Sequence, residues 1–342
     1  MSLADRIGKK ARNLQELENK GFNVPRFVVF SEATLKRVTT NEQLYKTIEN
    51  GFRSKYGMRL PNKVAVRSSG TTSTPGRMAT ILNVSTDKDS LVKAFNEVGD
   101  STTSTRLKKY LKAKNVTNFT YSIIVQEMVF GTQSDLSCSG VLLTVNPYGS
   151  EFDYYAEFLF NSFGDDLMSG NKTPELLESL VEKNPLAKER LDIVVNDIRK
   201  YFGESQEVEF VIQGTSVYVL QTRGYIAPKM FKTLTDHLDK PIGQGQSVTP
   251  IAMGGYVTFN KDKAKNTNIL ITETTDFEDT EAILHFAGVI TLKGGRLSHA
   301  AIIANEFDLP CVVGARFETM PKEGDYIIFS EKGTIFFGKS KN

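Results

Sequence analysis

The sequence predicts an α/β fold in more than one domain. Short apolar runs rich in β-branched residues, typical of strands, alternate along the chain with amphipathic stretches typical of helices. A chain of 342 residues with 40% hydrophobic residues is long enough for two or three packed domains. Its 24% of charged residues is ordinary for a folded protein, so a disordered chain is not expected.

The first predicted pair of elements is a helix followed by a strand. In KKARNLQELENKGFNVPRFVVFS, Ala11, Leu14 and Leu17 recur at helical spacing, Gly21 ends the helix, and a strand follows the next proline. The alternating valines of NKVAVRSSG predict a second strand, followed by a loop rich in glycine, serine and threonine over 68–76. An α/β unit is therefore expected at the start of the chain.

Four further strands are predicted in the middle of the chain. They are expected in YSIIVQEMVFG, CSGVLLTVNP, EVEFVIQG and SVYVLQTRG, and the last two form a hairpin across 213–215. Polar residues occupy alternating positions of this hairpin, as side chains on one face of a strand do. They are Glu207, Glu209, Gln221 and Arg223.

A linker is predicted after the hairpin. The stretch GYIAPKMFKTLTDHLDKPIGQGQS contains two prolines and three glycines, which predicts a linker or hinge over 226–245. Beyond it, short strand-like runs surround two helices, at 279–286 and 298–307, which predicts a small α/β domain. We therefore expect a first domain over 1–225 and a second over 246–342.

The composition excludes several classes of function. Lysine plus arginine (42) nearly balance aspartate plus glutamate (40), so no broad basic surface for nucleic acid is expected. No segment approaches the apolar length of a membrane span, and the first residues lack an apolar signal core, so we expect a cytoplasmic protein without a membrane partner. Cys138 and Cys311 lack metal-ligand spacing and are expected to be reduced thiols, with Cys311 in the core.

The stretch GGRLSHAAIIANEF places a histidine at the start of a predicted helix. Gly294 and Gly295 permit a tight turn, and Ser298 stands at the N-cap position, which leaves His299 in the first helical turn. The helix dipole there disfavours the imidazolium, and the free amides nearby suit a phosphate. The local pattern leaves two interpretations open: a phosphohistidine site, or a capped surface helix whose histidine has no chemical role.

The longer stretch GGRLSHAAIIANEFDLPCVVG resembles a family signature. It is similar to the phosphohistidine motif in the swivelling domain of phosphoenolpyruvate-utilising enzymes, the pyruvate phosphate dikinase and phosphoenolpyruvate synthase family. The resemblance implies that His299 is the phosphoryl carrier. It also implies that Gly294, Gly295 and Ser298 shape the loop around it.

The amino-terminal segments resemble the nucleotide-binding domain of the same family, which has an ATP-grasp fold. IGKKARNLQELENKGFNVPRFVVFS aligns Lys10 with the nucleotide-binding lysine of that domain, and VAVRSSGTTSTPGRMATILNV aligns Arg67 with its phosphate-binding arginine. Two positions depart from the family pattern: Lys9 replaces a glycine, and Ala79 replaces an acidic residue. The resemblance implies an ATP-grasp domain followed by a small α/β swivelling phosphohistidine domain.

The hairpin EVEFVIQGTSVYVLQTR resembles the segment that completes the family's ATP site. The resemblance implies that Glu209 and Gln221 hold Mg²⁺, which prefers oxygen ligands. A Walker A loop is not present. Taken singly, these residues are more typical of a solvated charged surface, and it is the set of ordered matches along the chain that favours the nucleotide site. The implied nucleotide- and phosphate-binding set is Lys10, Arg67, Glu207, Gln221 and Arg223.

Together these resemblances predict an ATP-dependent phosphotransferase. It would pass a phosphoryl or pyrophosphoryl group from Mg–ATP to His299, with Arg67 as a second catalytic residue. Full-length family members continue into a barrel that binds phosphoenolpyruvate and pyruvate, so the acceptor site is expected to be absent or supplied by another chain. Two alternatives remain: a small-molecule phosphotransferase like rifampin phosphotransferase, and a non-catalytic nucleotide-binding regulator, which Lys9 and Ala79 favour.

Overall fold

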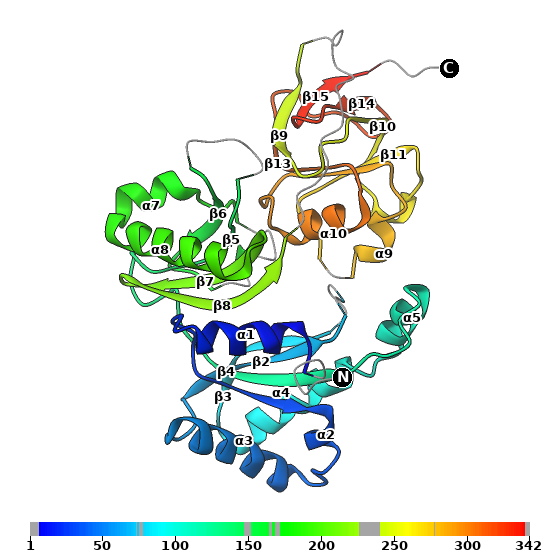
Figure 1. Ribbon diagram of the computed structural model, residues 1–342. Coiled ribbons are helices and arrows are strands. Elements are labelled where there is room, and N and C mark those ends of the chain that lie inside the picture. Colours follow the sequence, from blue (N-terminus) through cyan, green and yellow to red (C-terminus); the bar gives the residue numbers. More distant parts are fainter. Residues whose placement is uncertain are drawn as a thin grey trace. The chain divides into compact units, whose positions relative to one another are not determined.

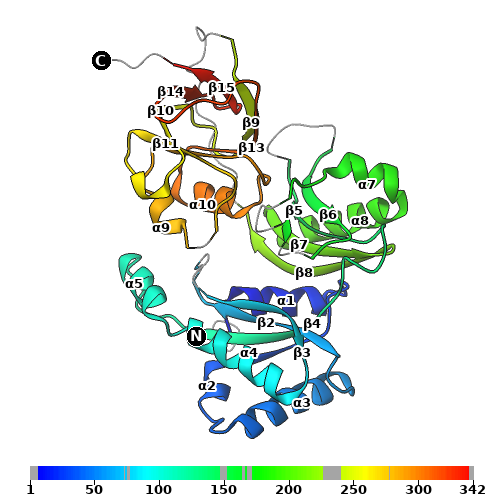
Figure 2. The ribbon, with the colours of Figure 1, turned by 180° about the vertical axis from the view of Figure 1, so that it is seen from behind.

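A computed structural model describes most of the chain (Figures 1 and 2). The chain divides into two compact units. Unit 1 is Met1–Phe130 with Arg190–Gly224, and unit 2 is Gly131–Glu189 with Tyr225–Asn342. The domain boundaries expected from the sequence stay a prediction, and residues 226–239 of the expected linker lie outside the described part. The described residues are 7–72, 74, 78–146, 152–163, 166–167, 172–225, 240–276 and 278–338.

An antiparallel sheet of four strands forms the centre of unit 1. Its order is β1-β4-β2-β3, and β2 and β4 are the inner strands. Alternation along β4 sends Ile123 and Val125 into one apolar cluster and Ile124 into another, so both faces of the sheet are covered. The strands are β1 Phe27–Ser31, β2 Lys63–Gly70, β3 Thr80–Ser85 and β4 Tyr121–Glu127.

Helices cover the two faces of this sheet. Figure 1 shows α3 and α4 on one face and α1 on the other. The larger cluster contains Ile48, Phe52 and Phe95 from α3 and α4, and the smaller contains Ala11 and Leu14 from α1. The helical spacing seen in the sequence is confirmed for α1. These helices are α1 Lys9–Asn19, α2 Glu32–Leu35, α3 Asn41–Tyr56, α4 Lys88–Ser101 and α5 Thr105–Ala113.

The predicted hairpin is confirmed as β7 and β8, which pair in antiparallel register around a turn at Gly214. The hairpin contacts α1: the side-chain amide of Asn13 donates to the Thr222 carbonyl oxygen at 2.8 Å. The preceding helical region is broken at Pro185 as predicted, since one helix ends at Lys183 and the next begins at the proline. These elements are α7 Leu177–Lys183, α8 Pro185–Phe202, β7 Gln206–Gln213 and β8 Ser216–Gly224.

The first stretch of unit 2 contributes the antiparallel pair β5 (Cys138–Leu143) and β6 (Tyr155–Phe160). Almost all of their side chains are buried. Glu157 is therefore unusual, because it is a carboxylate in the middle of a buried apolar strand.

The second stretch of unit 2 forms a closed barrel. The strand order is β10-β11-β12-β13-β9-β15-β14, and β14 closes on β10. Strands β10 to β13 run parallel, and the other pairs are antiparallel. The strands are β9 Gly243–Ser247, β10 Met253–Thr258, β11 Asn268–Thr272, β12 Gly288–Thr291, β13 Cys311–Phe317, β14 Tyr326–Phe329 and β15 Thr334–Phe337.

Two short helices pack on the outside of the barrel (Figures 1 and 2): α9 (Thr280–Ile283) and α10 (His299–Phe307). Along β11, Ile269 and Ile271 face the interior cluster, whereas Leu270 faces the helices. This alternation gives the barrel an apolar interior and an apolar outer patch under α10.

The barrel corrects two details of the sequence prediction. The helix expected over 279–286 is only one turn, because the chain leaves it in turns that bury Phe286 in the outer cluster. Strand β9 was not predicted, since Gly-Gln-Gly-Gln has little strand preference. Its glycines are required by packing: a Cβ on Gly245 would lie 2.5 Å from Val312.

None of the helices in the described part of the chain is both long and apolar enough to traverse a membrane.

Candidate functional site

The nucleotide-side residues predicted from the sequence lie together in unit 1. Arg67, at the middle of β2, is almost fully buried. Its Nη1 donates to Glu209 Oε2 at 3.1 Å and to Gln221 Oε1 at 3.5 Å. Glu209 and Gln221 are directly opposite in the β7–β8 register, so one arginine faces both predicted metal ligands.

One hydrogen-bond donor of Arg67 is unsatisfied among the described residues. Its Nε is buried and has no hydrogen-bond partner among the described residues. A buried donor without a partner is costly, and an anion placed beside it would remove that cost. This arrangement suits a phosphate oxygen.

Arg223 and Glu207 are paired with each other. The guanidinium donates from Nε and Nη2 to both carboxylate oxygens, at 2.8 and 2.9 Å. Such a two-point pair fixes the planar group in one orientation. Both residues thus lie on the predicted face of the hairpin. The arginine that the resemblance assigns to phosphate binding is paired with Glu207.

Lys10 enters this cluster from the first turn of α1. Burial lowers its pKa to about 8; the neighbouring Glu209 opposes the shift, and the positive charges of Arg67 and Arg223 add to it. Burial also disfavours the charge of Glu209, yet Arg67 and Lys10 hold the pKa of that carboxyl below its ordinary value. Three cations, Lys10, Arg67 and Arg223, therefore act on the carboxylate of Glu209, and one of them, Arg223, is also paired with Glu207.

A glycine fixes the start of α1. Gly8 has φ +81°, and a Cβ there would lie 2.5 Å from the Ser69 carbonyl oxygen and hydroxyl. The same hydroxyl accepts from the Ala11 amide at 3.0 Å, which ties α1 to β2. This close approach requires a glycine, and Gly8 supplies it. Lys9, which departs from the family pattern, is exposed.

Ala79, the second departure, contributes to packing. Its side chain lies partly buried against the core cluster of unit 1. Its amide donates to the Ser101 hydroxyl at 2.9 Å. The part of the preceding loop at 73 and 75–77 lies outside the described residues.

The predicted phosphohistidine loop lies in unit 2. Gly294 takes φ +89°, and Ser298 is the N-cap residue of α10, as expected. The Ser298 hydroxyl makes no cap bond and has no partner among the described residues. His299 is 2% exposed, so the interpretation as a surface histidine does not fit its position.

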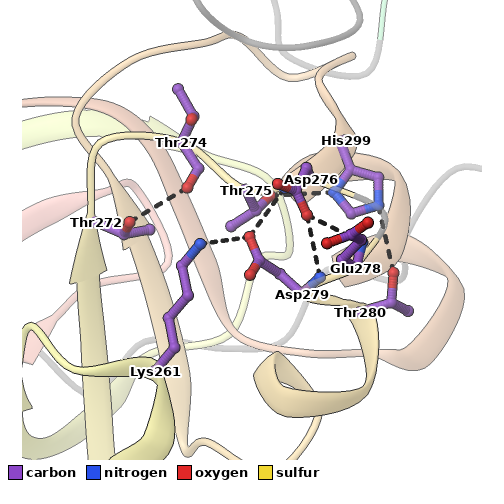
Figure 3. Close-up of polar contacts among 9 residues, drawn as sticks. All are labelled: Lys261, Thr272, Thr274, Thr275, Asp276, Glu278, Asp279, Thr280 and His299. Carbon is purple, nitrogen blue, oxygen red and sulfur yellow. Dashed lines mark hydrogen bonds and ion pairs between the residues drawn. The ribbon is translucent and has the colours of Figure 1, made fainter.

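Two threonines orient the imidazole of His299 (Figure 3). Thr275 Oγ1 lies 3.1 Å from Nδ1, and Thr280 Oγ1 lies 3.5 Å from Nε2. The first contact is within ordinary hydrogen-bond range and the second is at its limit. A proton on Nδ1 that is donated to Thr275 would leave the lone pair of Nε2 for a nucleophilic role.

The loop that carries Thr275 is itself braced (Figure 3). Lys261 pairs with the Asp279 carboxylate, which also accepts from the Asp276 amide at 3.0 Å. The Asp276 carboxylate accepts from the amides of Glu278 and Asp279. Sequence reasoning missed Thr275 and Thr280, although the polar run ETTDFEDT that contains both was visible; nothing local in it points to a histidine more than ten residues away.

Sequence reasoning also missed Glu157 of β6. Its carboxylate accepts hydrogen bonds from the backbone amides of Arg296 and Leu297, at 2.7 and 3.0 Å. The amides beside the phosphohistidine loop, expected to be free, are therefore partly occupied by a carboxylate of the same unit.

The described residues contain no group of three histidine, cysteine, aspartate or glutamate side chains that could hold a metal ion. A magnesium ion needs less than that, because it usually binds one or two protein carboxylates and completes its shell with phosphates and water. Cys138 and Cys311 are buried thiols outside any disulfide, as predicted, and burial raises the pKa of the Cys311 thiol to about 12.

Comparison with known proteins gives two family matches. Residues 43–184 match the pyruvate phosphate dikinase AMP/ATP-binding domain, and residues 264–330 match the mobile domain of PEP-utilising enzymes. Arg67 lies in the first segment and His299 in the second. Lys10 and the β7–β8 residues lie outside both.

Curated relatives point to the same family. Pyruvate, phosphate dikinase 2 of Zea mays is 30% identical over 270 residues, covering 66% of this chain and 31% of that protein. Pyruvate, phosphate dikinase of Rickettsia typhi is 27% identical over 310 residues, covering 73% and 35%. The chain thus spans about a third of the length of these relatives.

Among solved structures, the D-alanine–D-alanine ligase of Bacillus anthracis complexed with ATP aligns with a TM-score of 0.35 at 11% identity. The alignment covers 63% of this chain and 52% of that one, and a likeness this low assigns no function.

The chain therefore combines, in an α/β fold, a segment similar to the pyruvate phosphate dikinase AMP/ATP-binding domain with a later segment similar to the mobile domain of PEP-utilising enzymes. This chain is a pyruvate phosphate dikinase/phosphoenolpyruvate synthase-like protein, as the sequence resemblance predicted.

Proposed function

We propose that this chain is an ATP-dependent phosphotransferase that transfers a phosphoryl or pyrophosphoryl group from Mg–ATP to His299. The observation that carries the proposal is a buried, oriented imidazole at the first residue of α10. The same chain holds Lys10, Arg67 and Arg223 around the carboxylate of Glu209. These are the two halves of one transfer reaction: a nucleophile, and a set of cations for a polyphosphate.

The residues on β7 and β8 fit a magnesium ion. Glu209 offers an ionised carboxylate and Gln221 an amide oxygen, side by side on neighbouring strands. When bound, the metal would neutralise charge on the phosphate oxygens. Both ligands face Arg67, so the arginine would move from the carboxylate to a phosphate when the nucleotide binds.

Different residues of the chain would then bind the phosphates and attack phosphorus. Lys10 and Arg67 hold the phosphates, and the Nε donor of Arg67 that lacks a partner receives a phosphate oxygen. Thr275 holds Nδ1, so that the lone pair of Nε2 attacks phosphorus. A nitrogen–phosphorus bond forms as a phosphorus–oxygen bond breaks, and the nucleotide leaves as ADP if the γ-phosphorus is attacked, or as AMP if the β-phosphorus is attacked.

The acceptor that discharges His299 stays a proposal as well. The predicted hinge over 226–245 would let His299 serve a nucleotide in one position and an acceptor in another. The contact between Glu157 and the loop before His299 would be made in the first of these positions. We propose that the acceptor site belongs to a part of the protein outside this sequence, or to another chain. A substrate domain of the rifampin phosphotransferase type is not needed for the first half-reaction.

Incubation of the chain with labelled Mg–ATP tests the proposal. We expect a phosphoprotein that is stable in alkali and labile in acid, as a phosphoramidate on imidazole is and a serine ester is not. Release of AMP would identify transfer from the β-phosphorus, and ADP alone would identify a simple γ-kinase. Nucleotide binding without labelling would instead identify a non-catalytic nucleotide-binding regulator.

The pKa of Lys10 makes nucleotide affinity depend on pH. The free site carries the ammonium below about pH 8, and a bound phosphate raises the pKa of that group further. Affinity should therefore be constant below pH 8 and fall as pH rises above 8, by up to about tenfold per unit. Calorimetric titration with nucleotide at pH 7, 8 and 9 measures this slope.

Lys10→Arg provides the matched control, because a guanidinium keeps its charge across this range. It should bind with a flat pH profile. The same slope in both proteins would show that another group titrates.

A further inference from the structure

The phosphohistidine loop is attached to β6 of its own unit through a single buried carboxylate. Glu157 is completely buried. Its Oε1 accepts from the Arg296 amide at 2.7 Å and its Oε2 from the Leu297 amide at 3.0 Å. Tyr155 donates its hydroxyl to the same carboxylate at 2.5 Å. Three donors converge on one ion, so its buried charge is compensated.

The loop is shaped for this contact. A Cβ on Gly295 would collide with both carboxylate oxygens of Glu157, although the glycine backbone itself is one that other residues can adopt. A side chain at 295 is therefore excluded by the carboxylate. Glycine at this position is thus explained by close approach, whereas Gly294 is explained by its positive φ.

Side chains beside the two amides strengthen the contact. Leu297 packs in an apolar cluster with Val141, Leu143 and Leu159 of β5 and β6. The guanidinium of Arg296 lies 5.9 Å from the centre of the Tyr155 ring. The loop preceding His299 is thus held by charge, shape and apolar burial together.

The contact needs the ionised form of Glu157, because a protonated carboxyl gives up one acceptor position. Burial raises the pKa of Glu157 above its ordinary value, and the hydrogen bonds from Tyr155, Arg296 and Leu297 with the charge of Arg296 offset only part of that rise. Hydrogen bonding to an ionised group is also stronger than to a neutral one. An amide in place of the carboxylate would therefore weaken the attachment without changing the size of the side chain.

Resting on the function proposed above, we propose that Glu157 is a positioning residue for phosphoryl transfer. Its carboxylate receives the amides of Arg296 and Leu297 and so fixes the loop that presents His299. Glu157 itself need not touch the nucleotide. Its effect on the reaction passes through the backbone of the loop.

The first test measures the contact without any reaction. Amide hydrogen exchange of the segment 292–298 is compared in the intact chain and in Glu157→Gln, without nucleotide. The amides of Arg296 and Leu297 should exchange at least about tenfold faster in the variant. Glu182→Gln, which changes an exposed carboxylate on α7 of the same unit, should exchange like the parent.

The second test approaches the contact from the loop. Gly295→Ala should displace the carboxylate and speed exchange in the same segment, which also covers the case in which Glu157→Gln folds poorly. In a Glu157→Ala background, where the oxygens are gone, Gly295→Ala should add little. This loss of additivity is the signature of a direct contact.

The third test asks whether the contact serves transfer. At saturating Mg–ATP, Glu157→Gln should label His299 at least about tenfold more slowly, with nucleotide affinity unchanged. Unchanged amide exchange in both variants would overturn the contact, and faster exchange with an unchanged labelling rate would overturn the positioning role. If the parent protein is not labelled at all, the proposed function fails, and so does the positioning role, while exchange still decides the contact.

Discussion

His299→Ala is expected to abolish the acid-labile phosphoprotein completely. The imidazole is the only nucleophile proposed for the transfer, and its environment is specialised: it is 2% exposed, and Thr275 lies 3.1 Å from Nδ1. Alanine keeps α10 intact, because its helix propensity is higher than that of histidine. The measurement is incorporation of label from Mg–ATP, followed by treatment with acid and alkali.

A matched control exists for this change. His285 is exposed and follows α9, outside the phosphohistidine loop, so His285→Ala should be labelled at the parent rate. Nucleotide binding should survive in both variants, since neither histidine belongs to the cluster around Arg67. Equal labelling of His299→Ala and the parent would remove His299 from the mechanism.

Arg67→Ala should slow labelling by roughly a thousandfold, if the arginine acts chiefly on the transition state. It supplies positive charge and a donor without a partner beside the proposed phosphate position. Its removal also deprives Glu209 of the partner at 3.1 Å. Single-turnover labelling rates measure the effect. The control is Arg53→Ala, an exposed arginine on α3 that pairs with Glu49 in the same helix.

Glu209→Ala should cost a similar factor by another route, because it removes a proposed magnesium ligand. Raising the magnesium concentration should therefore restore part of the activity of Glu209→Ala and none of that of Arg67→Ala. Rates within a few-fold of the parent for both variants would contradict the site assignment.

Local patterns in the sequence predicted much of the fold. The apolar spacing of α1, the turn at Gly214 and the break at Pro185 depend on neighbours in sequence, and the structure confirms each. The closed barrel could not be predicted in this way. It depends on β9, which has weak strand preference and exists because β13 and β15 pair with it.

In the candidate site, too, the features that depend on neighbours in sequence could be predicted, and those that depend on tertiary structure could not. The loop before His299 was visible as a continuous motif, and the β7–β8 residues as an alternating pattern. The side chains that orient the loop and the ring were not visible, since Thr275, Thr280 and Glu157 come from other elements. Their roles arise only when tertiary structure brings them to the imidazole or to the amides of Arg296 and Leu297.

Because Arg67 is paired with Glu209, binding of ATP and binding of magnesium are expected to be coupled at the nucleotide site. In the free protein the arginine and the carboxylate satisfy each other. A polyphosphate that draws Arg67 away leaves Glu209 without its ion-pair partner, and a cation alone competes with Arg67 for the same oxygens. Each ligand therefore relieves the cost of the other, so magnesium should raise the affinity for ATP, and ATP should raise the affinity for magnesium by the same factor.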